Sequence, residues 1–294
     1  MSIPAPRESG YSTTTASPLY WALYGPSTAA RLFVLHGGPG AHHDYLLPQF
    51  LALANRWELF FYDQRGGGRS RTDDRAPITW RTHVEDLAAV AREFARGPLS
   101  LIGYSWGGLL ALLYADWAQR ERDVPRPARM VLVDPAPATR RWRDSFELEL
   151  SRRQQLDVIA QDRAALTTSG MRESDPAAYR QRLFELSVAG YFADPQRAHQ
   201  LTPFRVTGRV QKSVWESLGD FDLIADLEKI PAPTLVIHGR DDPIPLASST
   251  AIARALPRGE LVVLDGSGHV PYVEAATPLF DAISRFLDRT ERVI

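Results

Sequence analysis

The sequence predicts an α/β protein with a mostly parallel central sheet, helices on both faces of the sheet, and an inserted helical segment. Two observations support this prediction. Apolar strand-like runs alternate with helix-like segments through most of the chain, and this alternation stops between residues 136 and 229. A length of 294 residues accommodates one large α/β domain that carries an insertion.

Strands are expected where short runs are rich in aliphatic and aromatic residues. These runs are Leu19–Tyr24, Arg31–Leu35, Trp57–Tyr62, Leu99–Ile102, Met130–Val133, Thr234–Ile237 and Leu261–Leu264. A helix is expected over Thr79–Arg96, because Thr79 is a suitable N-cap and the apolar residues that follow fall on one face. A second helix, Thr277–Leu287, is expected to close the chain.

The segment Ala136–Lys229 is charged, has helical periodicity and contains no strand-like alternation. No Gly/Ser-rich linker flanks it, which favours a lid over a free-standing second domain. An insertion after the strand that ends at Val133 lies above the carboxyl ends of the strands, where open α/β sheets bind ligands. We therefore predict a core made of residues 1–135 and 230–294, and a helical cap made of residues 136–229.

Composition excludes several classes of function. The net charge of −1 gives no indication of a nucleic-acid partner or an acidic membrane surface, and the absence of cysteine excludes disulfides and thiol catalysis. The stretch Met1–Ser17 lacks the apolar core of a signal peptide, and no apolar run approaches the ~20 residues that span a bilayer. We expect a cytoplasmic enzyme with no membrane partner, and the sequence does not indicate its oligomeric state.

The stretch Gly103-Tyr104-Ser105-Trp106-Gly107 carries the clearest chemical signal. It reads G-x-S-x-G, follows the apolar run Leu99–Ile102 and precedes a segment rich in helix formers. A serine on such a strand-to-helix turn has a strained backbone and an exposed hydroxyl, and its flanking glycines let strand and helix approach closely. We predict that Ser105 is a nucleophile. The alternative is a chance match in a glycine-rich loop.

A serine hydroxyl needs a base, and the base needs a group that orients it. Among the seven histidines, only His238 and His269 lie in the C-terminal third. His238 ends an apolar strand, so a structural role is expected for it. His269 lies in the loop Asp265–Pro271 directly after the last strand, and we predict that it is the base.

The acid should follow the preceding strand, where Asp241 and Asp242 stand next to each other. We favour Asp242, and we expect Asp241 to be a turn residue that bonds local backbone amides. Asp134 also ends a strand and is a third option. Its expected role is to cap the turn into the insertion.

A tetrahedral intermediate needs backbone N–H donors aimed at its oxyanion. The Trp106 N–H is one candidate, because it follows the nucleophile. The glycine-rich loop His36–Gly40 is the expected source of the second donor, with Gly38 favoured over Gly37. The loop lacks the spacing of a phosphate-binding motif, so a phosphate site is not expected.

Polar residues near these loops are expected to be supporting residues. Asp63 and Arg65 follow the aromatic strand and should brace the active-site loops through charge-assisted hydrogen bonds. His42 and His43 have no partner ligands at zinc spacing, and we expect both at the surface. The sequence predicts a mechanism without a metal or a cofactor.

Three stretches together resemble the prolyl iminopeptidases and related serine aminopeptidases of the α/β-hydrolase fold. They are His36–Gly40, Asp63–Ser70 and Gly103–Gly108, and the resemblance is good over residues 19–135. The segments around Asp242 and His269 are similar to those of α/β-hydrolases in general. The resemblance implies an α/β-hydrolase fold with release of an N-terminal residue, often proline, from a small peptide without a metal.

The cap departs from the pattern of this family. Its members often carry a glutamate shortly before a Tyr-Phe pair, where the carboxylate holds the amino group of the substrate. Here Val188 stands at that place, before Tyr191 and Phe192. Glu185, about one helical turn earlier, is either a substitute or a solvated helix residue. Without a cap carboxylate an ammonium group loses its charge partner, so a carboxylesterase or amidase for small neutral acyl substrates is the alternative.

Several other cap residues are candidates for contact with a small-molecule or short-peptide substrate. We predict that Glu185, Tyr191, Phe192 and Trp215 bind it, and the carboxylates Glu147, Glu149, Glu173 and Glu216 and the aromatic residues Trp142 and Phe184 are further candidates without a ranking. A non-catalytic binding protein on the same scaffold is a remote alternative. The presence of all three triad candidates argues against it.

Overall fold

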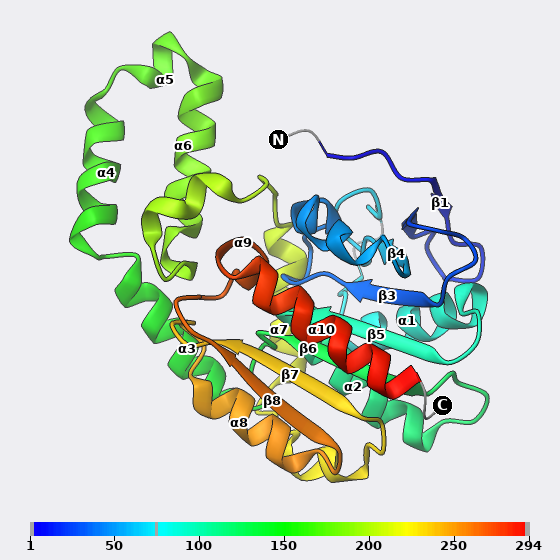
Figure 1. The fold of residues 1–294 in the computed structure, drawn as a ribbon. Coiled ribbons are helices and arrows are strands. Elements are labelled where there is room, and N and C mark those ends of the chain that lie inside the picture. The colour runs from blue at the N-terminus through cyan, green and yellow to red at the C-terminus, as the bar shows by residue number, and fades with distance from the viewer. Residues whose placement is uncertain (1–2, 74–75, 292–294) are drawn as a thin grey trace.

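One central sheet organises the molecule, and the computed structural model describes residues 3–73 and 76–291. Within those residues the sheet has eight strands in the order β1-β2-β4-β3-β5-β6-β7-β8 (Figure 1). The strands are β1 (Glu8–Tyr11), β2 (Tyr20–Tyr24), β3 (Arg31–Leu35), β4 (Glu58–Tyr62), β5 (Leu99–Tyr104), β6 (Pro127–Val133), β7 (Thr234–Gly239) and β8 (Gly259–Leu264). The pairs β1–β2 and β2–β4 are antiparallel, and all other neighbouring pairs are parallel. The mostly parallel α/β sheet predicted from the alternation is confirmed.

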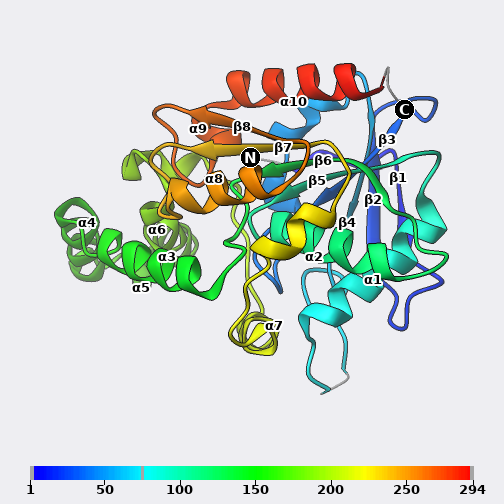
Figure 2. The ribbon, with the colours of Figure 1, turned by 90° about the horizontal axis from the view of Figure 1, so that it is seen from below.

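Helices cover both faces of the sheet (Figure 2). The face covered by α1 (Trp80–Phe94), α2 (Trp106–Arg120) and α8 (Leu246–Ala255) is opposite to the face covered by α10 (Ala276–Glu291) and the short turns η1 (His43–Leu46) and η2 (Gln49–Leu53). Along β3, Phe33 belongs to the first apolar cluster and Leu32 to the second. Both faces of the central strands are therefore buried, which explains their continuous apolar runs.

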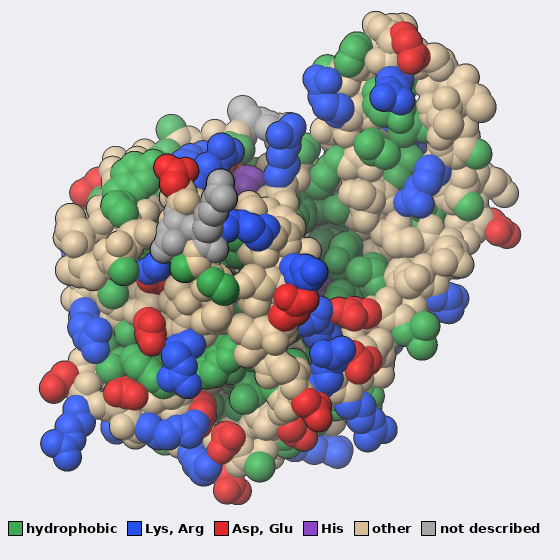
Figure 3. All heavy atoms as spheres, turned by 180° about the vertical axis from the view of Figure 1, so that it is seen from behind, with side chains coloured by type: hydrophobic (Ala, Val, Ile, Leu, Met, Phe, Trp, Pro, Cys, Tyr) green, Lys and Arg blue, Asp and Glu red, His purple; other side chains and the backbone are tan. Residues whose placement is uncertain are grey.

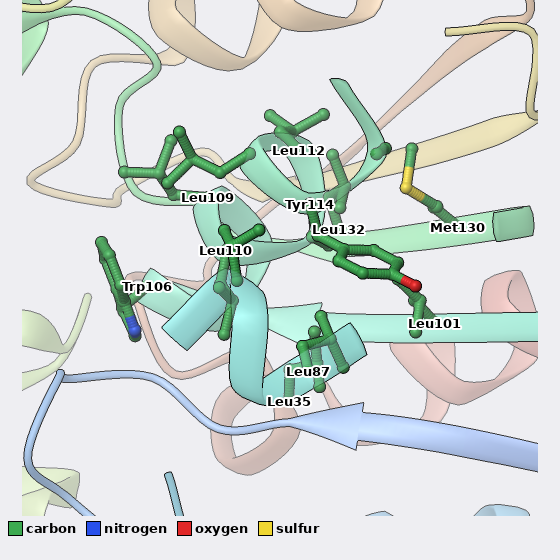
Figure 4. Packing of buried hydrophobic residues seen from close by; sticks show 14 of the residues in the cluster. Leu35, Leu87, Leu101, Trp106, Leu109, Leu110, Leu112, Tyr114, Met130 and Leu132 are labelled. Carbon is green, nitrogen blue, oxygen red and sulfur yellow. The ribbon is translucent and has the colours of Figure 1, made fainter. Parts of the chain in front are cut away.

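Capping and packing fix the positions of α1 and α2. The side chain of Thr79 accepts a hydrogen bond from the Thr82 N–H at 3.2 Å, so the predicted N-cap of α1 is confirmed. Figure 4 shows leucines of α2 packed with Leu101 of β5 and Leu132 of β6, all in one buried cluster. This packing fixes the start of α2 beside the end of β5, where Ser105 lies.

Helices fill the chain between β6 and β7. They are α3 (Arg140–Arg153), α4 (Asp157–Thr168), α5 (Met171–Ser174), α6 (Pro176–Val188), η3 (Ala189–Tyr191), η4 (Pro195–Gln200), α7 (Gly208–Leu218) and η5 (Ile224–Lys229). The helices α4, α5 and α6 project away from the sheet (Figure 1). The boundaries of the core and of the cap stay a prediction. Residues 1–2, 74–75 and 292–294 of the predicted core lie outside the described residues.

β1 and α8 are among the elements that the sequence did not predict. β1 lies in a polar stretch and is mostly exposed, so no apolar alternation marks it. The helix α8 follows the Asp242 loop and has few large apolar residues, although Ile252 and Ala253 are buried against the sheet. Among the described residues, no helix combines the length and the apolar character needed to cross a bilayer.

Candidate active site

Ser105 occupies the turn between β5 and α2. Its φ of 53° and ψ of −118° lie outside the regions that side-chain-bearing residues normally adopt. A Cβ on Gly103 would collide with the carbonyl oxygen of Gly107, and a Cβ on Gly107 would collide with that of Leu35. The two glycines therefore let α2 start directly against the strand ends, as the motif predicts.

A continuous hydrogen-bond chain joins three distant parts of the sequence. The Ser105 hydroxyl donates to His269 Nε2 at 2.9 Å, and His269 Nδ1 donates to Asp242 Oδ2 at 2.8 Å. Asp242 is buried, whereas Asp241 is exposed and its backbone N–H donates to the carbonyl of Ser267. The structure thus brings together Ser105, His269 and the favoured one of the two neighbouring aspartates.

Burial shifts the pKa values of His269 and Asp242. It lowers the pKa of His269 to about 4, so the imidazole is neutral at pH 7 and its Nε2 is free to accept a proton. Burial also raises the pKa of Asp242 to about 7. A neutral imidazole beside the hydroxyl is the state that a general base requires.

Asp134 ends β6 with a φ of 41° and lies against the same site. Its Oδ1 accepts a hydrogen bond from the Gly239 N–H in β7 at 2.7 Å, so the expectation that it caps the turn into the cap is wrong. Burial and the nearby Asp242 carboxylate raise the pKa of Asp134 well above its usual range. Two carboxylates whose oxygens lie within 4.8 Å of each other do not ionise together freely, so Asp134 favours its protonated form.

His238 is buried beside Asp134 and Asp242, and its contacts agree with the structural role expected for it. Its Nδ1 bonds with the Ser249 hydroxyl at 2.9 Å and its Nε2 with the Ile244 carbonyl at 3.0 Å. One carboxylate oxygen of Asp134, one of Asp242 and one ring nitrogen of His238 lie within 4.8 Å of one another, which is a set of atoms that could ligate a metal ion. Both nitrogens already have hydrogen-bond partners, so the group is explained by its own contacts.

Candidate backbone donors for an oxyanion lie in two places. The Trp106 N–H lies at the first residue of α2, and Gly38 has a φ of 58° that favours glycine. The Gly37 N–H donates to the Tyr45 hydroxyl at 2.6 Å. Because that donor is engaged, Gly38 is the better second candidate.

The indole of Trp106 is fixed by a buried network. Its Nε1 donates to Gln64 Oε1 at 2.8 Å, and Gln64 in turn bonds with His36 through its backbone N–H at 3.0 Å and its side chain at 2.8 Å. Burial lowers the pKa of His36 to about 4, so its Nε2 remains an acceptor. The network links the Gln64 loop to the start of α2.

The supporting roles expected for Asp63 and Arg65 agree with their contacts. Asp63 Oδ1 lies 2.7 Å from His43 Nδ1, and its Oδ2 accepts from the Arg69 N–H at 2.9 Å. Arg65 Nε donates to Asp86 in α1 at 2.9 Å. The expected surface position of His43 is wrong, because its ring is 1% exposed and serves as a partner of Asp63, while His42 is half-buried.

A cavity of about 450 Å³ lies beside the catalytic candidates, and we call it the aromatic cavity. Phe146, Tyr191 and Trp215 line it. The Tyr191 ring lies 5.3 Å from the His269 ring, and the Trp215 ring lies 5.3 Å from that of Trp106. Its charged lining consists of Arg140, Arg143, Lys212, Glu147 and Glu216.

Two of the four residues predicted to bind substrate therefore lie at the site, and two do not. Tyr191 and Trp215 line the aromatic cavity. Phe192 is 2% exposed and packs in the core. Glu185 accepts from Gln181 and Arg182 at 3.0 Å each, so both carboxylate oxygens are engaged within α6.

Glu274 is a residue that sequence reasoning missed. Its carboxylate accepts from the Gly268 N–H at 2.7 Å, from the Ala193 N–H at 3.0 Å and from the Asp194 N–H at 3.2 Å. The His269 N–H also donates to the Tyr191 carbonyl at 2.7 Å. These bonds hold the loop that carries His269 against the cap, and no local pattern separates Glu274 from a solvated helix glutamate.

Comparison with known proteins agrees with this geometry. The model of the alpha/beta hydrolase family matches residues 32–282. A proline iminopeptidase of Saccharolobus solfataricus is 25% identical over 298 positions, covering 96% of this chain and 93% of the relative. A proline iminopeptidase of Clostridium botulinum is 26% identical over 302 positions, covering 96% and 98%.

The fold likeness extends over nearly the whole chain. The crystal structure of a proline iminopeptidase of Mycobacterium smegmatis superposes with a TM-score of 0.71 at 22% identity, covering 97% of this chain and 99% of that one. The family match spans well over half of the sequence. The chain therefore belongs to the alpha/beta hydrolase family, is similar to proline iminopeptidases, and is a hydrolase.

Proposed function

We propose that the protein is a serine hydrolase that works through an acyl-enzyme. The observation that carries the proposal is the hydrogen-bond chain from Ser105 through His269 to Asp242, with distances of 2.9 Å and 2.8 Å. Ser105 Oγ attacks the substrate carbonyl while His269 Nε2 takes the hydroxyl proton. His269 then gives that proton to the leaving group as its bond to the carbonyl carbon breaks.

Deacylation repeats these steps with water. His269 takes a proton from water, the resulting hydroxide oxygen bonds to the acyl carbon, and Ser105 leaves with the proton returned by the imidazole. Asp242 keeps Nδ1 protonated and stabilises the imidazolium. The N–H groups of Trp106 and Gly38 are proposed to hold the oxyanion in both steps.

For the substrate, we propose an aminopeptidase of the prolyl iminopeptidase type. The relatives at 25% and 26% identity over almost the whole chain support this assignment. The substrate's ammonium group needs a carboxylate, and Glu147 and Glu216 are the carboxylates that line the aromatic cavity. They replace Glu185 as the candidates, because Glu185 is engaged within α6.

A second candidate function is a carboxylesterase or amidase for small neutral acyl substrates. The charged lining of the aromatic cavity favours it, since three basic residues and two acidic residues line the cavity. Glu147 is also paired with Arg143, whose Nε donates to it at 2.8 Å. A cavity with more basic than acidic side chains selects only weakly for a substrate that carries an ammonium group.

A substrate panel separates the two functions. Proline arylamides and short acyl esters are assayed side by side, and the aminopeptidase proposal expects turnover of the arylamides. Strong ester cleavage with no arylamide turnover would contradict it. Replacing Glu147 and Glu216 by glutamine should raise KM for proline arylamides and leave KM for neutral esters unchanged.

The nucleophile is tested separately. An organophosphonate should label Ser105, and Ser105→Ala should lose on the order of 10⁴–10⁶ in kcat. Ser151→Ala, at an exposed position in α3, is the matched control and should keep both labelling and turnover. A folded protein that resists labelling would favour a non-catalytic binding protein. The cytoplasmic location and the absence of a nucleic-acid partner stay predictions.

A further inference from the structure

A second cavity, of about 640 Å³, lies between the cap and the core. Its walls come from α6, from the segment 203–207 and from the loops around Asp44 and residues 68–71. Figure 3 shows a hollow between the cap lobe and the body, with hydrophobic side chains inside it and lysine or arginine side chains near its edge. We call this cavity the arginine pocket, after Arg69, Arg71, Arg180 and Arg205 in its lining.

The charge of the arginine pocket is one-sided. Arg69 is paired with Asp44, at 2.8 Å and 3.0 Å, and Asp44 is the single carboxylate among the described lining residues. Arg71, Arg180 and Arg205 have no carboxylate within 4.0 Å in the part of the chain that the structure describes. Three arginines thus line one cavity without a carboxylate partner among those residues, an arrangement that attracts an anion.

The pocket also has an apolar wall that leads toward the glycine-rich loop His36–Gly40. Phe184 and Phe204 line it, with their rings 5.5 Å apart and edge to face. The Phe204 ring lies 4.5 Å from that of Tyr45, whose hydroxyl accepts from the Gly37 N–H. One aromatic side chain therefore connects the pocket wall to the loop beside Ser105.

We propose that the arginine pocket binds a carboxylate-bearing amphipathic ligand. The guanidinium groups of Arg180, Arg205 and Arg71 hold the carboxylate, and Phe184 and Phe204 contact the apolar part. A planar carboxylate suits a guanidinium because two parallel N–H groups bond its two oxygens. The first source of the carboxylate is the free C-terminus of a short peptide substrate, and this source rests on the proposed aminopeptidase function. The second source is a separate small carboxylate molecule.

Binding to the catalytically silent Ser105→Ala protein tests the site without requiring any activity. Isothermal titration compares octanoate with octanamide, and the tripeptide Pro-Leu-Gly with its C-terminal amide. Exposed charge pairs are each worth little, so the carboxylate form of the ligand that uses the pocket should bind about 3- to 30-fold tighter. The preference should shrink as salt is raised.

Matched variants assign the preference to the pocket. Arg180→Gln combined with Arg205→Gln should abolish it, while Arg172→Gln, at an exposed position on α5, should leave it intact. The double variant should unfold at the same temperature as the wild type, which shows that the fold is kept.

The outcomes distinguish the sources. A preference for the peptide with a free carboxylate supports the substrate C-terminus, and a preference for octanoate alone supports a separate carboxylate molecule. No preference in either pair, or a preference that survives in the double variant, overturns the proposal. Failure of peptide turnover contradicts the proposed aminopeptidase function. The octanoate measurement still tests the arginine pocket in that case, because it does not depend on peptide turnover.

Discussion

Replacing His83 by phenylalanine should make the stability of the protein less sensitive to acid. His83 lies in α1, is 1% exposed, and neither ring nitrogen has a hydrogen-bond partner among the described residues. Burial lowers its pKa to about 3, whereas an exposed histidine titrates near 6.5. The ring therefore stays neutral in the folded protein below pH 6 and takes up a proton when the chain unfolds.

The size of the effect follows from the linkage between protonation and folding. A group that binds its proton mainly in the unfolded state removes stability as pH falls below its unfolded pKa. Each pH unit removes about 1.4 kcal/mol, so His83 removes about 2 kcal/mol between pH 6.5 and pH 5. Burial also lowers the pKa values of His36, His238 and His269 to about 4, and their contributions have the same sign.

Urea unfolding at pH 7 and at pH 5 measures the effect. His83→Phe should reduce the loss of unfolding free energy between these pH values by about 2 kcal/mol relative to the wild type. The phenyl ring keeps the edge contact with Trp106, at 6.0 Å between ring centres, and a packing cost that is equal at both pH values cancels in the difference. His199→Gln, at an exposed position, is the control. An equal loss in His83→Phe and in the wild type would refute the reasoning.

Three further outcomes concern the site and are measured by steady-state kinetics on one common substrate. Asp242→Asn should lower kcat by about 10⁴-fold and Asp241→Asn should not, because Asp242 contacts His269, the proposed base, and Asp241 does not. The opposite order would refute this assignment. Asp134→Asn should leave kcat and the acid limb of the pH–rate profile unchanged, because a neutral amide replaces a carboxyl that is already neutral; a shifted limb would show that Asp134 is ionised. Gln64→Leu should lower kcat by about tenfold with little change in KM, since it frees the indole of Trp106, and an unchanged kcat would exclude that role.

The sheet and the triad candidates were predictable because their signals are local. Each of Ser105, Asp242 and His269 follows an apolar run that forms a strand, and parallel strands bring their carboxyl ends to one edge. The glycines around Ser105 report a steric requirement that any L side chain would violate. Short stretches of sequence are therefore enough to predict the fold and the candidate nucleophile.

Other parts of the site depend on contacts between distant segments. Glu185 stands near the expected place for an amine partner, yet Gln181 and Arg182 on the same helix engage it. His43 resembles a surface residue in the sequence, but in the structure its Nδ1 lies 2.7 Å from Oδ1 of Asp63, 20 positions later. Asp134 ends a strand like a turn residue, but the neighbouring strand supplies its partner. Such partners are set by packing, which a single sequence does not display.

The shared bonds between the cap and the His269 loop have a mechanical consequence. Glu274 and the Tyr191 carbonyl tie residues 191–194 to the loop that carries His269, so a hinge motion of the cap would drag the imidazole away from Ser105. The protein would then be active only while the cap stays in contact with the core. A bulky substrate that pushes the cap outward should have a much lower kcat, with a smaller change in KM. A change mainly in KM would show that the cap and the His269 loop move independently.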